Sequence, residues 1–364
     1  MLAARTTLGV GGPVRHLASC ASPDAVEAAL SWANERGLPV AVLGGGSNLL
    51  VADSGFGGLM LAVTDDALTV ERHLDHAIVR AGGGVEWDAL VASAVDAGLA
   101  GLEGLSGIPG RVGAAPIQNV GAYGQEVAET IVGVRVVERA TGAVLDLAAD
   151  ACGFGYRWSR FKGDWRDRYV IVRVDFRLPH SVDGTVRYPD LLRRLGLDED
   201  EDATATLPTI RHAVLEVRRS KSMVLDPDDP NRRSAGSFFT NPIVAPAVAA
   251  AVAEQVRRRN GRRPMPRYPA GPDDPRVKLS AAWLIEEAGF SRGWGNGPAG
   301  LSTRHTLAIV NRGGATAADI LRVASTIRRG VRDTFGVILE PEPTFLGFDR
   351  PAAEILDRPS DAHS

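Results

Sequence analysis

Residues 104–124 read GLSGIPGRVGAAPIQNVGAYG, a stretch in which almost every residue is small or favours a turn. The few polar groups among them include Ser106, Gln118 and Asn119. Glycine lacks the Cβ that keeps a ligand away from the main chain, so this backbone can lie against a planar, hydrogen-bonding ring. Isoleucine and valine recur along the stretch, which argues against an irregular surface loop. The stretch therefore predicts a backbone surface for a large planar cofactor.

A second glycine-rich segment, Gly44–Asn48, follows the predicted strand Val40–Leu43 directly. Successive N–H groups of such a segment form a nest for a pyrophosphate, although a plain tight turn is the alternative. A Rossmann turn is excluded, even though Asp65 lies about twenty residues further on, where that fold's ribose acid would stand. Leu49 occupies the place of the third glycine, and the following residues form a short apolar run and a turn instead of a helix. The segment predicts a phosphate-binding loop of another kind.

Bulk composition limits the class of protein. The 364 residues exceed one ordinary core, so two or three domains are expected. A hydrophobic content of 45% is typical of a soluble globular protein, and a net charge of −3 provides no broad cationic field for nucleic acid or anionic lipid. Cys20 and Cys152 have neither metal-ligand spacing nor a disulfide pattern, so two free thiols and no metal site are expected. No run approaches the ~20 apolar residues of a membrane span and no leader precedes the first glycines, which predicts a cytoplasmic protein.

The secondary structure predicted from periodicity and capping signals changes along the chain. Strands are expected early, at Val40–Leu43, Leu59–Val63, Ala77–Ala81, Ile131–Glu138 and Tyr169–Leu178. Helices are expected at Ala25–Arg36 (capped by Ser22-Pro23 and ended by Gly37), Glu86–Ala97, Ile210–Ser220, Ala245–Arg258, Leu279–Ala288 and Ala317–Thr334 (introduced by Thr316 and Asp319, ended by Gly336). This segregation of strands and helices predicts an α+β fold instead of a doubly wound sheet.

Domain boundaries are predicted near Val217 and Gly336, where the composition changes. The expected parts are a domain over 1–216, with subdomains of roughly 1–68 and 69–216, and a second domain over 217–336. A last strand, Val337–Gly347, is expected to bring 337–350 back to the first domain, and 351–364 is expected to be a polar, mobile tail. The acidic stretch Asp198–Asp202 is predicted to be a surface turn, and the segments Asp226–Ser234 and Arg259–Pro275 are predicted to be loops.

Together the two glycine segments resemble the FAD-binding module of the vanillyl-alcohol-oxidase (PCMH-type) flavoproteins. Within that superfamily, Ile108–Gly110 with Pro116–Gly124 is similar to the UDP-N-acetylenolpyruvylglucosamine reductase family. The resemblance implies a two-part FAD-binding domain followed by a C-terminal α+β substrate-binding domain. Neither His nor Cys occurs in either segment, so non-covalent FAD is expected. The residues that the resemblance places against FAD are Gly44, Gly45, Gly46, Ser47, Asn48, Ser106, Ile108, Pro109, Gly110, Gly113, Ala114, Gln118, Asn119, Gly121, Ala122 and Tyr123.

The resemblance also implies a reaction. NADPH would reduce the flavin at N5, and hydride would then pass to C3 of the enolpyruvyl ether on UDP-N-acetylglucosamine, giving UDP-N-acetylmuramate for peptidoglycan synthesis. The carbanion left at C2 is delocalised into the carboxylate as an enolate. Such an intermediate needs positive charge or hydrogen bonds at the carboxylate and a proton donor at C2. The expected partners are therefore NADPH and the UDP-sugar, with no nucleic acid, and a monomer is expected.

Three residues are the candidates for this chemistry. Arg157, in a Tyr-Arg element, would hold the carboxylate with its planar donor fork; the alternative is a surface arginine beside aromatics. Ser237, in Gly-Ser-Phe-Phe, matches the family's proton donor to C2; the alternative is a turn serine. Glu342, in the sequence LEPEP, matches the family's catalytic glutamate, a role that suits a carboxylic acid whose pKa is raised by burial. Glu340 is the neighbour most easily confused with it, and Pro343 constrains the backbone that follows.

Substrate contacts are expected around these residues. Arg218 and Lys221 lie about one helical turn apart, where they would clamp a diphosphate or the carboxylate. Tyr188 matches the tyrosine that closes over UDP in one subgroup of the family, the Tyr-loop (type I) subgroup, but Pro189 replaces the usual glycine, which puts the mobility of that loop in doubt. The full predicted set is Tyr156, Tyr188, Arg218, Lys221, Asn241 and His305. At His305 the family pattern has an amide side chain.

Three other functions compete. An FAD-dependent oxidase of the same superfamily would need a base at the substrate where Ser237 and Glu342 offer proton donors. A flavin- or nucleotide-binding regulator would leave the flavin spectrum unchanged on addition of NADPH. A Ser-His-Asp hydrolase with Ser237 as its nucleophile would need a Gly-x-Ser-x-Gly elbow, which is absent around Ser237. The sequence therefore favours the reductase.

Overall fold

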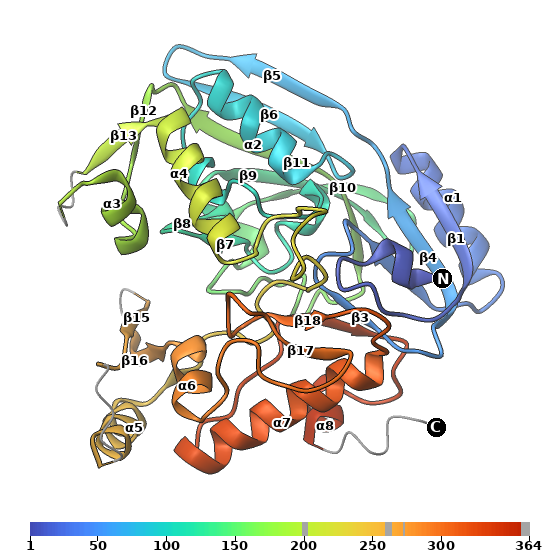
Figure 1. Cartoon of the computed structure of the whole chain (residues 1–364). Helices are drawn as coiled ribbons and strands as arrows, with labels where there is room; N and C mark the ends of the chain where they lie inside the picture. The colour runs from blue at the N-terminus through green and yellow to red at the C-terminus, as the bar shows by residue number, and fades with distance from the viewer. Residues whose placement is uncertain (199–202, 259–263, 272–273, 358–364) are drawn as a thin grey trace. The chain divides into compact units, whose positions relative to one another are not determined.

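The computed structural model describes residues 1–198, 203–258, 264–271 and 274–357 (Figure 1). Its contacts divide the chain into two compact units, and each is built from separate segments of sequence. The sheet unit consists of Val14–Gly45 and Gly57–Leu225. The C-terminal unit consists of Met1–Pro13, Gly46–Phe56 and Asp226–Ser364. The predicted division at 217 therefore differs from the observed one at 225, and two early segments belong with the C-terminal part of the chain.

A five-stranded antiparallel sheet forms the centre of the sheet unit, in the order β10-β9-β11-β6-β5. Its longest strand, β11, is rich in valine and alternates between buried and less buried positions, as a strand covered on one face does. Helix α2 packs its apolar face, including Trp87 and Leu90, against Val79 and Phe176 of this sheet. The bounds are β5 Leu68–Arg72, β6 His76–Gly82, β9 Ile131–Glu138, β10 Val144–Ala148, β11 Tyr169–Pro179 and α2 Trp87–Asp96.

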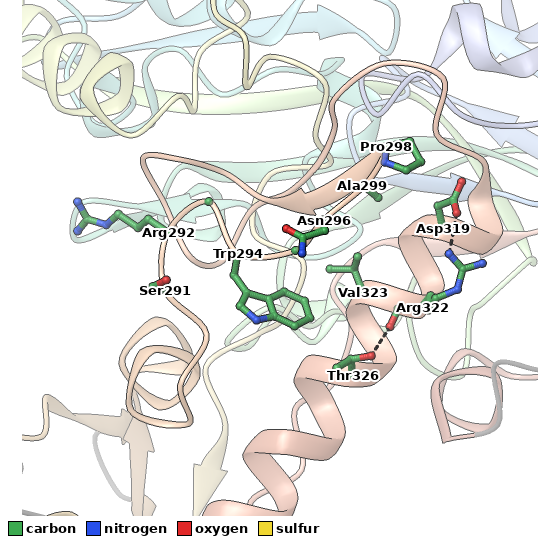
Figure 2. Close-up of a pocket in the computed structure, with 12 residues that line it drawn as sticks. Ser291, Arg292, Trp294, Asn296, Pro298, Ala299, Asp319, Arg322, Val323 and Thr326 are labelled. Carbon is green, nitrogen blue, oxygen red and sulfur yellow. Dashed lines mark hydrogen bonds and ion pairs between the residues drawn. The ribbon is translucent and has the colours of Figure 1, made fainter.

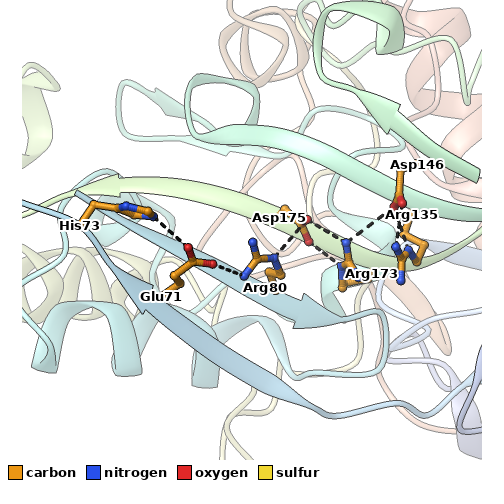
Figure 3. Close-up of polar contacts among 7 residues, drawn as sticks. All are labelled: Glu71, His73, Arg80, Arg135, Asp146, Arg173 and Asp175. Atoms are coloured by element: carbon orange, nitrogen blue, oxygen red, sulfur yellow. Dashed lines mark hydrogen bonds and ion pairs between the residues drawn. The ribbon is translucent and has the colours of Figure 1, made fainter. Parts of the chain in front are cut away.

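The other face of this sheet carries a row of alternating charges (Figure 3). Arg80 of β6 lies 2.8 Å from Glu71 of β5 and 3.8 Å from Asp175 of β11. The row continues through Arg173 to Asp146 of β10, 3.6 Å away. Exposed ion pairs each stabilise a fold by only about 0–1 kcal/mol. The row therefore marks a solvated face and gives no sign of a binding site.

A three-stranded sheet, in the order β1-β4-β2, packs against helix α1. The predicted helix cap is confirmed, since the N–H of Ala25 donates to Ser22 Oγ at 3.2 Å and Pro23 occupies the first helical turn. Strands β2 and β4 run parallel, and β2 ends at Leu43, immediately before the first glycine segment. The bounds are β1 Val14–Cys20, α1 Pro23–Asn34, β2 Val40–Leu43 and β4 Phe56–Val63.

The last part of the sheet unit has its own small core, in which Leu191 and Leu192 pack against Ile210 and Val214. Tyr123 and Tyr188 lie against this core. Proline at position 189 is the first residue of α3, a place where its missing N–H costs nothing and its fixed φ favours a helix. The bounds are β7 Gly121–Ala122, β8 Gln125–Glu126, β12 Asp183–Thr185, α3 Pro189–Leu195, β13 Thr204–Thr206 and α4 Leu207–Ser220.

Helix α7 forms the centre of the C-terminal unit and packs against β17 and β18 (Figure 1). Its predicted ends are confirmed: Thr316 and Asp319 form a reciprocal capping box, and Gly336 adopts a left-handed φ of 69°. Asp53 adds to the cap by accepting from the N–H of Ala317 at 2.7 Å. The bounds are β3 Leu49–Val51, β14 Ile243–Val244, α5 Pro246–Arg258, β15 Arg267–Gly271, β16 Asp274–Leu279, α6 Ala281–Glu287, β17 Ala299–Leu301, β18 Ile309–Asn311, α7 Ala317–Phe335, β19 Thr344–Leu346 and α8 Ala352–Asp357.

Several local predictions were wrong. The segment Arg259–Pro275 contains the described strand β15 and the start of β16, which pair antiparallel, so it is not simply a loop. The strand expected over Val337–Gly347 is confined to β19, because Pro341 and Pro343 interrupt it. It pairs in parallel with β3, and both strands belong to the C-terminal unit. The tail expected after Arg350 contains helix α8. Residues 199–202 of the predicted acidic turn lie outside the described residues.

Candidate active site

The two glycine segments meet as backbone in the sheet unit. A Cβ added to Gly45 would lie 2.7 Å from the Cα of Gly110, closer than any real side chain comes, so only glycine allows this approach. A Cβ on neighbouring Gly44 would come within 3.4 Å of the Cβ of Ala114. Gly44 and Gly45 are exposed, so their backbone groups are open to a ligand. Segments more than sixty positions apart in the printed sequence thus form one bare backbone surface, which fits the flat cofactor that the sequence predicted.

A substitution at Gly45 tests this surface. Gly45→Ala should lower the affinity for FAD by roughly 5- to 150-fold, because overpacking costs about 1–3 kcal/mol. Gly57→Ala is the matched control, since a Cβ there meets nothing within 4 Å. The measurement is titration of the flavin-free protein with FAD, followed by flavin fluorescence. Equal affinities for the two variants would contradict the assignment of Gly45 to the cofactor surface.

The start of the second glycine segment is fixed by side chains that the sequence analysis did not select. The N–H of Gly104 donates to Gln125 Oε1 at 2.6 Å, and Gln125 in turn donates to Glu103 at 2.7 Å. The N–H of Gly107 donates to Asp88 Oδ1 at 2.6 Å. Ser106 is fully buried and its hydroxyl donates to the carbonyl of Glu103 at 2.6 Å, so its expected FAD contact stays a prediction. This part of the loop is pre-organised by the protein itself.

Asp88 holds more than the loop, because Arg211 of α4 donates to both of its carboxylate oxygens, at 2.6 and 2.9 Å. Burial acts to raise the pKa of Asp88, but the hydrogen bonds from Arg211 and Gly107 and the nearby positive charges outweigh it and lower that pKa below its usual range. Asp88 is therefore ionised at neutral pH. No sequence signal pointed to this pair, since the partners lie on different helices far apart in the chain.

Asn119 links the second glycine segment to the Tyr-Arg element. Its amide nitrogen donates to Glu126 Oε2 at 2.7 Å and to the carbonyl of Gly155 at 3.0 Å, while its oxygen accepts from the N–H of Ala128 at 3.0 Å. The side chain is 1% exposed. Asn119 therefore braces the loop from inside the protein, and its predicted contact with FAD is a proposal.

Arg157 docks on the same segment, since its Nη2 donates to the carbonyl of Gly121 at 2.6 Å and its guanidinium lies 5.6 Å from the Tyr156 ring centre. Three predicted site residues, Asn119, Tyr123 and Arg157, have left-handed φ angles of 46°, 51° and 51°. Only five non-glycine residues in the described chain have a positive φ. Such backbone persists only where the surrounding structure imposes it, and it concentrates at functional sites. The backbone therefore supports these three predictions.

Three of the predicted substrate contacts in the sheet unit, Tyr188, Arg218 and Lys221, lie close to one another around Tyr123 and α3. Tyr123 and Tyr188 meet edge to face with ring centres 5.2 Å apart. Lys221, directly after α4, contacts Asp190 of α3 at 2.7 Å. Arg218 donates from Nη2 to the carbonyl of Met223 at 2.6 Å, and its buried Nε has no acceptor among the described residues. A buried donor without an acceptor is rare in native structures, which supports Arg218 as a ligand contact.

Burial raises the pKa of Tyr123, and the positive charge of Arg218, which is hydrogen-bonded to it, works in the opposite direction. The Tyr123 hydroxyl therefore stays protonated at neutral pH and is available as a hydrogen-bond donor.

Asn48, Ser237 and Glu342 come together in the C-terminal unit. The N–H of Glu342 donates to the carbonyl of Phe238 at 2.9 Å, and the carbonyl of Glu342 accepts from Asn48 Nδ2 at 3.2 Å. The N–H of Phe238 donates to the carbonyl of Leu307 at 2.8 Å. Ser237 is half-buried, and the two phenylalanines after it are 1% exposed. The backbone on both sides of this junction is therefore fixed, and two predicted catalytic residues lie on it.

At the same junction, Glu342 and Glu340 differ in exposure. The Glu340 side chain is 60% exposed and faces Arg328 at 3.7 Å, whereas Glu342 is half-buried. This geometry supports the choice of Glu342.

The remaining predicted contacts of the C-terminal unit border this junction. Asn241 accepts from the N–H of Ala281 at 2.9 Å and so caps helix α6. His305 lies in the turn that presents the carbonyl of Leu307 to Phe238. Their contacts with substrate are proposals.

A separate groove of about 480 Å³ lies between residues 291–299 and helix α7 (Figure 2). It is lined by Trp294 and Asn296 from the loop and by Val323 and Thr326 from the helix, with Arg322 paired to Asp319 at 2.8 Å. None of the predicted site residues lines it.

The described residues contain no group of three His, Cys, Asp or Glu side chains able to hold a metal ion. No helix in the described part of the chain is long and apolar enough to span a membrane.

A curated relative, UDP-N-acetylenolpyruvoylglucosamine reductase of Thermobifida fusca (strain YX), is 51% identical over 349 residues, covering 95% of this chain and 96% of the relative. The chain belongs to the UDP-N-acetylenolpyruvoylglucosamine reductase family. The relative of the same name from Nocardia farcinica (strain IFM 10152) is 48% identical, with 95% and 88% of the two chains covered. The crystal structure of the reductase from Thermus caldophilus is 28% identical with a TM-score of 0.63, covering 95% of this chain and 97% of that one.

Two family models divide the reductase chain. An FAD binding domain matches residues 14–148, which include both glycine segments. The C-terminal domain of UDP-N-acetylenolpyruvoylglucosamine reductase matches residues 228–346, which include Ser237, Asn241, His305 and Glu342. The predicted family and the α+β fold with FAD-binding and C-terminal domains are confirmed. Arg157, Tyr188, Arg218 and Lys221 lie between the two matched regions.

Proposed function

We propose that this protein reduces the enolpyruvyl ether of UDP-N-acetylenolpyruvylglucosamine to the lactyl ether of UDP-N-acetylmuramate, with FAD as cofactor and NADPH as reductant. The observation that carries the proposal is the junction that holds the backbone of Glu342 against Phe238, the residue directly after Ser237. The same proposal includes a cytoplasmic, monomeric enzyme whose partners are the UDP-sugar and NADPH.

FAD, when bound, supplies a hydride acceptor for NADPH and a hydride donor for C3 of the substrate. Gly44 and Gly45 with the second glycine segment are the residues proposed to hold it. Gly44 and Gly45 are exposed, and the approach of Gly45 to Gly110 leaves no side chain between the two segments.

Three residues are proposed to manage the charge that hydride addition leaves on the substrate. Arg157 binds the carboxylate, into which the negative charge moves, and Glu342 donates a hydrogen bond to it. Ser237 gives its hydroxyl proton to C2. A serine hydroxyl is a poor acid in water, so its fixed position next to the developing carbanion is what makes the transfer effective.

Anaerobic stopped-flow spectroscopy tests the function directly. NADPH should bleach the flavin absorbance of the purified protein, and addition of the enolpyruvyl sugar should restore it in a single exponential phase. Rapid restoration by O₂ with no response to the sugar would identify an oxidase. No bleaching by NADPH would identify a non-catalytic flavin protein.

Arg157→Ala should leave FAD bound and slow the restoration of flavin absorbance by the sugar by about 10²- to 10³-fold, because one group that stabilises developing charge is lost. The control is Arg160→Ala, which removes a nearby arginine paired with Asp164 at 2.6 Å. The same traces provide the measurement, with the flavin content taken from the visible spectrum. Loss of the yellow cofactor from the Arg157 variant would refute its assignment to the substrate.

A further inference from the structure

A buried arginine supports the segment that leads to Glu342. The Arg328 side chain, on α7, is 6% exposed. Its Nε donates to the carbonyl of Leu339 at 2.9 Å, its Nη1 pairs with Asp357 of α8, and its Nη2 lies 3.7 Å from Glu340. The planar guanidinium fixes the direction of each of these contacts, which a flexible ammonium does not. Arg328 therefore ties three separate elements of the C-terminal unit to one point.

The contact reaches Glu342 through a short and stiff path. Pro341 and Pro343 flank Glu342 and restrict the backbone φ at both positions. The carbonyl of Glu340 accepts from the N–H of Thr240 at 3.0 Å, and the N–H of Glu342 donates to the carbonyl of Phe238 at 2.9 Å. With Arg328 on Leu339, three successive attachments fix the chain as it approaches the catalytic position. Because the chain between Leu339 and Glu342 is short and held at each step, a displacement of Leu339 should also displace Glu342.

Helix α8 holds the arginine in place. Ile355 and Leu356 are fully buried in the core that α7 also enters. The hydroxyl of Ser325, one turn before Arg328, donates to the carbonyl of Leu356 at 2.5 Å. These contacts deliver the Asp357 carboxylate to the buried guanidinium, which needs a counter-charge where water is scarce. The residues after Arg350, which composition alone indicates to be a tail, thus support the site.

We propose that Arg328, held by Asp357 of α8, is a positioning residue for Glu342 in the reaction with the UDP-sugar. The inference rests on the proposed role of Glu342. Misplacement of a reacting group by about 1 Å costs up to about 100-fold in rate. Loss of the Arg328 contacts therefore slows the step in which the substrate is reduced and leaves reduction of the flavin by NADPH unchanged.

The test compares Arg328→Gln and Asp357→Asn with Arg332→Gln in the full-length, FAD-loaded protein. Arg332 lies one turn further along α7, is 44% exposed and pairs with the adjacent Asp333 at 3.0 Å, so it is the matched control. Flavin reduction by NADPH should stay within about twofold of wild type in all three. Restoration by the enolpyruvyl sugar should slow by about 10- to 100-fold in Arg328→Gln, by less in Asp357→Asn, and not in Arg332→Gln.

A second readout separates positioning from general loosening. The limiting rate of restoration should fall while the sugar concentration at half-maximal rate stays the same, because the substrate contacts are intact. A parallel fall of both half-reactions together with the melting temperature would overturn the proposal in favour of a structural role. An unchanged restoration rate in a folded Arg328→Gln would overturn it directly. If Arg328→Gln does not fold, the isosteric Asp357→Asn provides the test, by the same comparison of its two half-reactions.

Glu342→Ala, measured alongside, separates this inference from the function on which it rests. A normal restoration rate in that variant would remove the proposed role of Glu342, and the positioning of it by Arg328 as well. A slow Glu342→Ala beside a wild-type Arg328→Gln would overturn the positioning alone.

Discussion

Ser237→Ala is expected to slow restoration of the flavin by the enolpyruvyl sugar by about 10²- to 10⁴-fold, the range for loss of a general acid. Reduction by NADPH should stay near normal, since no proton from Ser237 enters that step. The loss should be large because nothing else at this position replaces the hydroxyl: the residues that follow are Phe238 and Phe239, both 1% exposed. Single-turnover stopped-flow traces for each half-reaction give the measurement.

The control for this substitution is Ser234→Ala, in the same loop. The Ser234 hydroxyl accepts from the N–H of Gly236 at 3.3 Å, so its removal loosens the turn without removing a proposed proton donor. Ser234→Ala should keep both half-reactions within a few-fold of wild type. Equal losses in both half-reactions of Ser237→Ala, or equal losses in the two variants, would show that Ser237 is structural.

Glu342→Ala is expected to slow the same half-reaction by about 10²- to 10³-fold, because one hydrogen-bond donor to the developing enolate is lost. Glu342→Gln should recover part of that rate, since the amide also donates a hydrogen bond and needs no proton to do so. The backbone of Glu342 is held by Phe238 and Asn48 whatever its side chain is, so both variants should fold. Single-turnover restoration rates of the two variants provide the check.

The matched pair for Glu342 is Glu340, two residues earlier. Its side chain is 60% exposed, and its 3.7 Å contact with Arg328 is a solvent-screened one, so Glu340→Gln should change the rate by no more than about twofold. A Glu340 variant slower than the Glu342 variant would mean that the two glutamates were assigned the wrong way round.

Local signals in the sequence predicted local structure well. The N-terminal ends of α1 and α7 follow from Ser22 and Thr316, since a cap depends on residues within one turn. Strands β2 and β9 occur at their predicted bounds because their β-branched runs are bounded by turn residues. The β15–β16 hairpin and α8 were missed, because each depends on contacts with residues far along the chain.

Residues 104–124 determined the family and the cofactor class, because a flat backbone surface requires glycine and small residues wherever the ligand comes close, and that requirement is written directly into the chain. Only the tertiary structure decided which side chains hold that surface. Asp88 reaches Gly107 and Arg211 from another helix, and Arg328 reaches Leu339 and Asp357. The same structure supports Glu342 over Glu340 as the catalytic candidate, because Glu342 is half-buried and the Glu340 side chain is 60% exposed. A hydrogen bond between residues far apart in the chain produces no recognisable sequence pattern. The glycine segments can therefore be found from the sequence, but the side chains that hold them in place cannot.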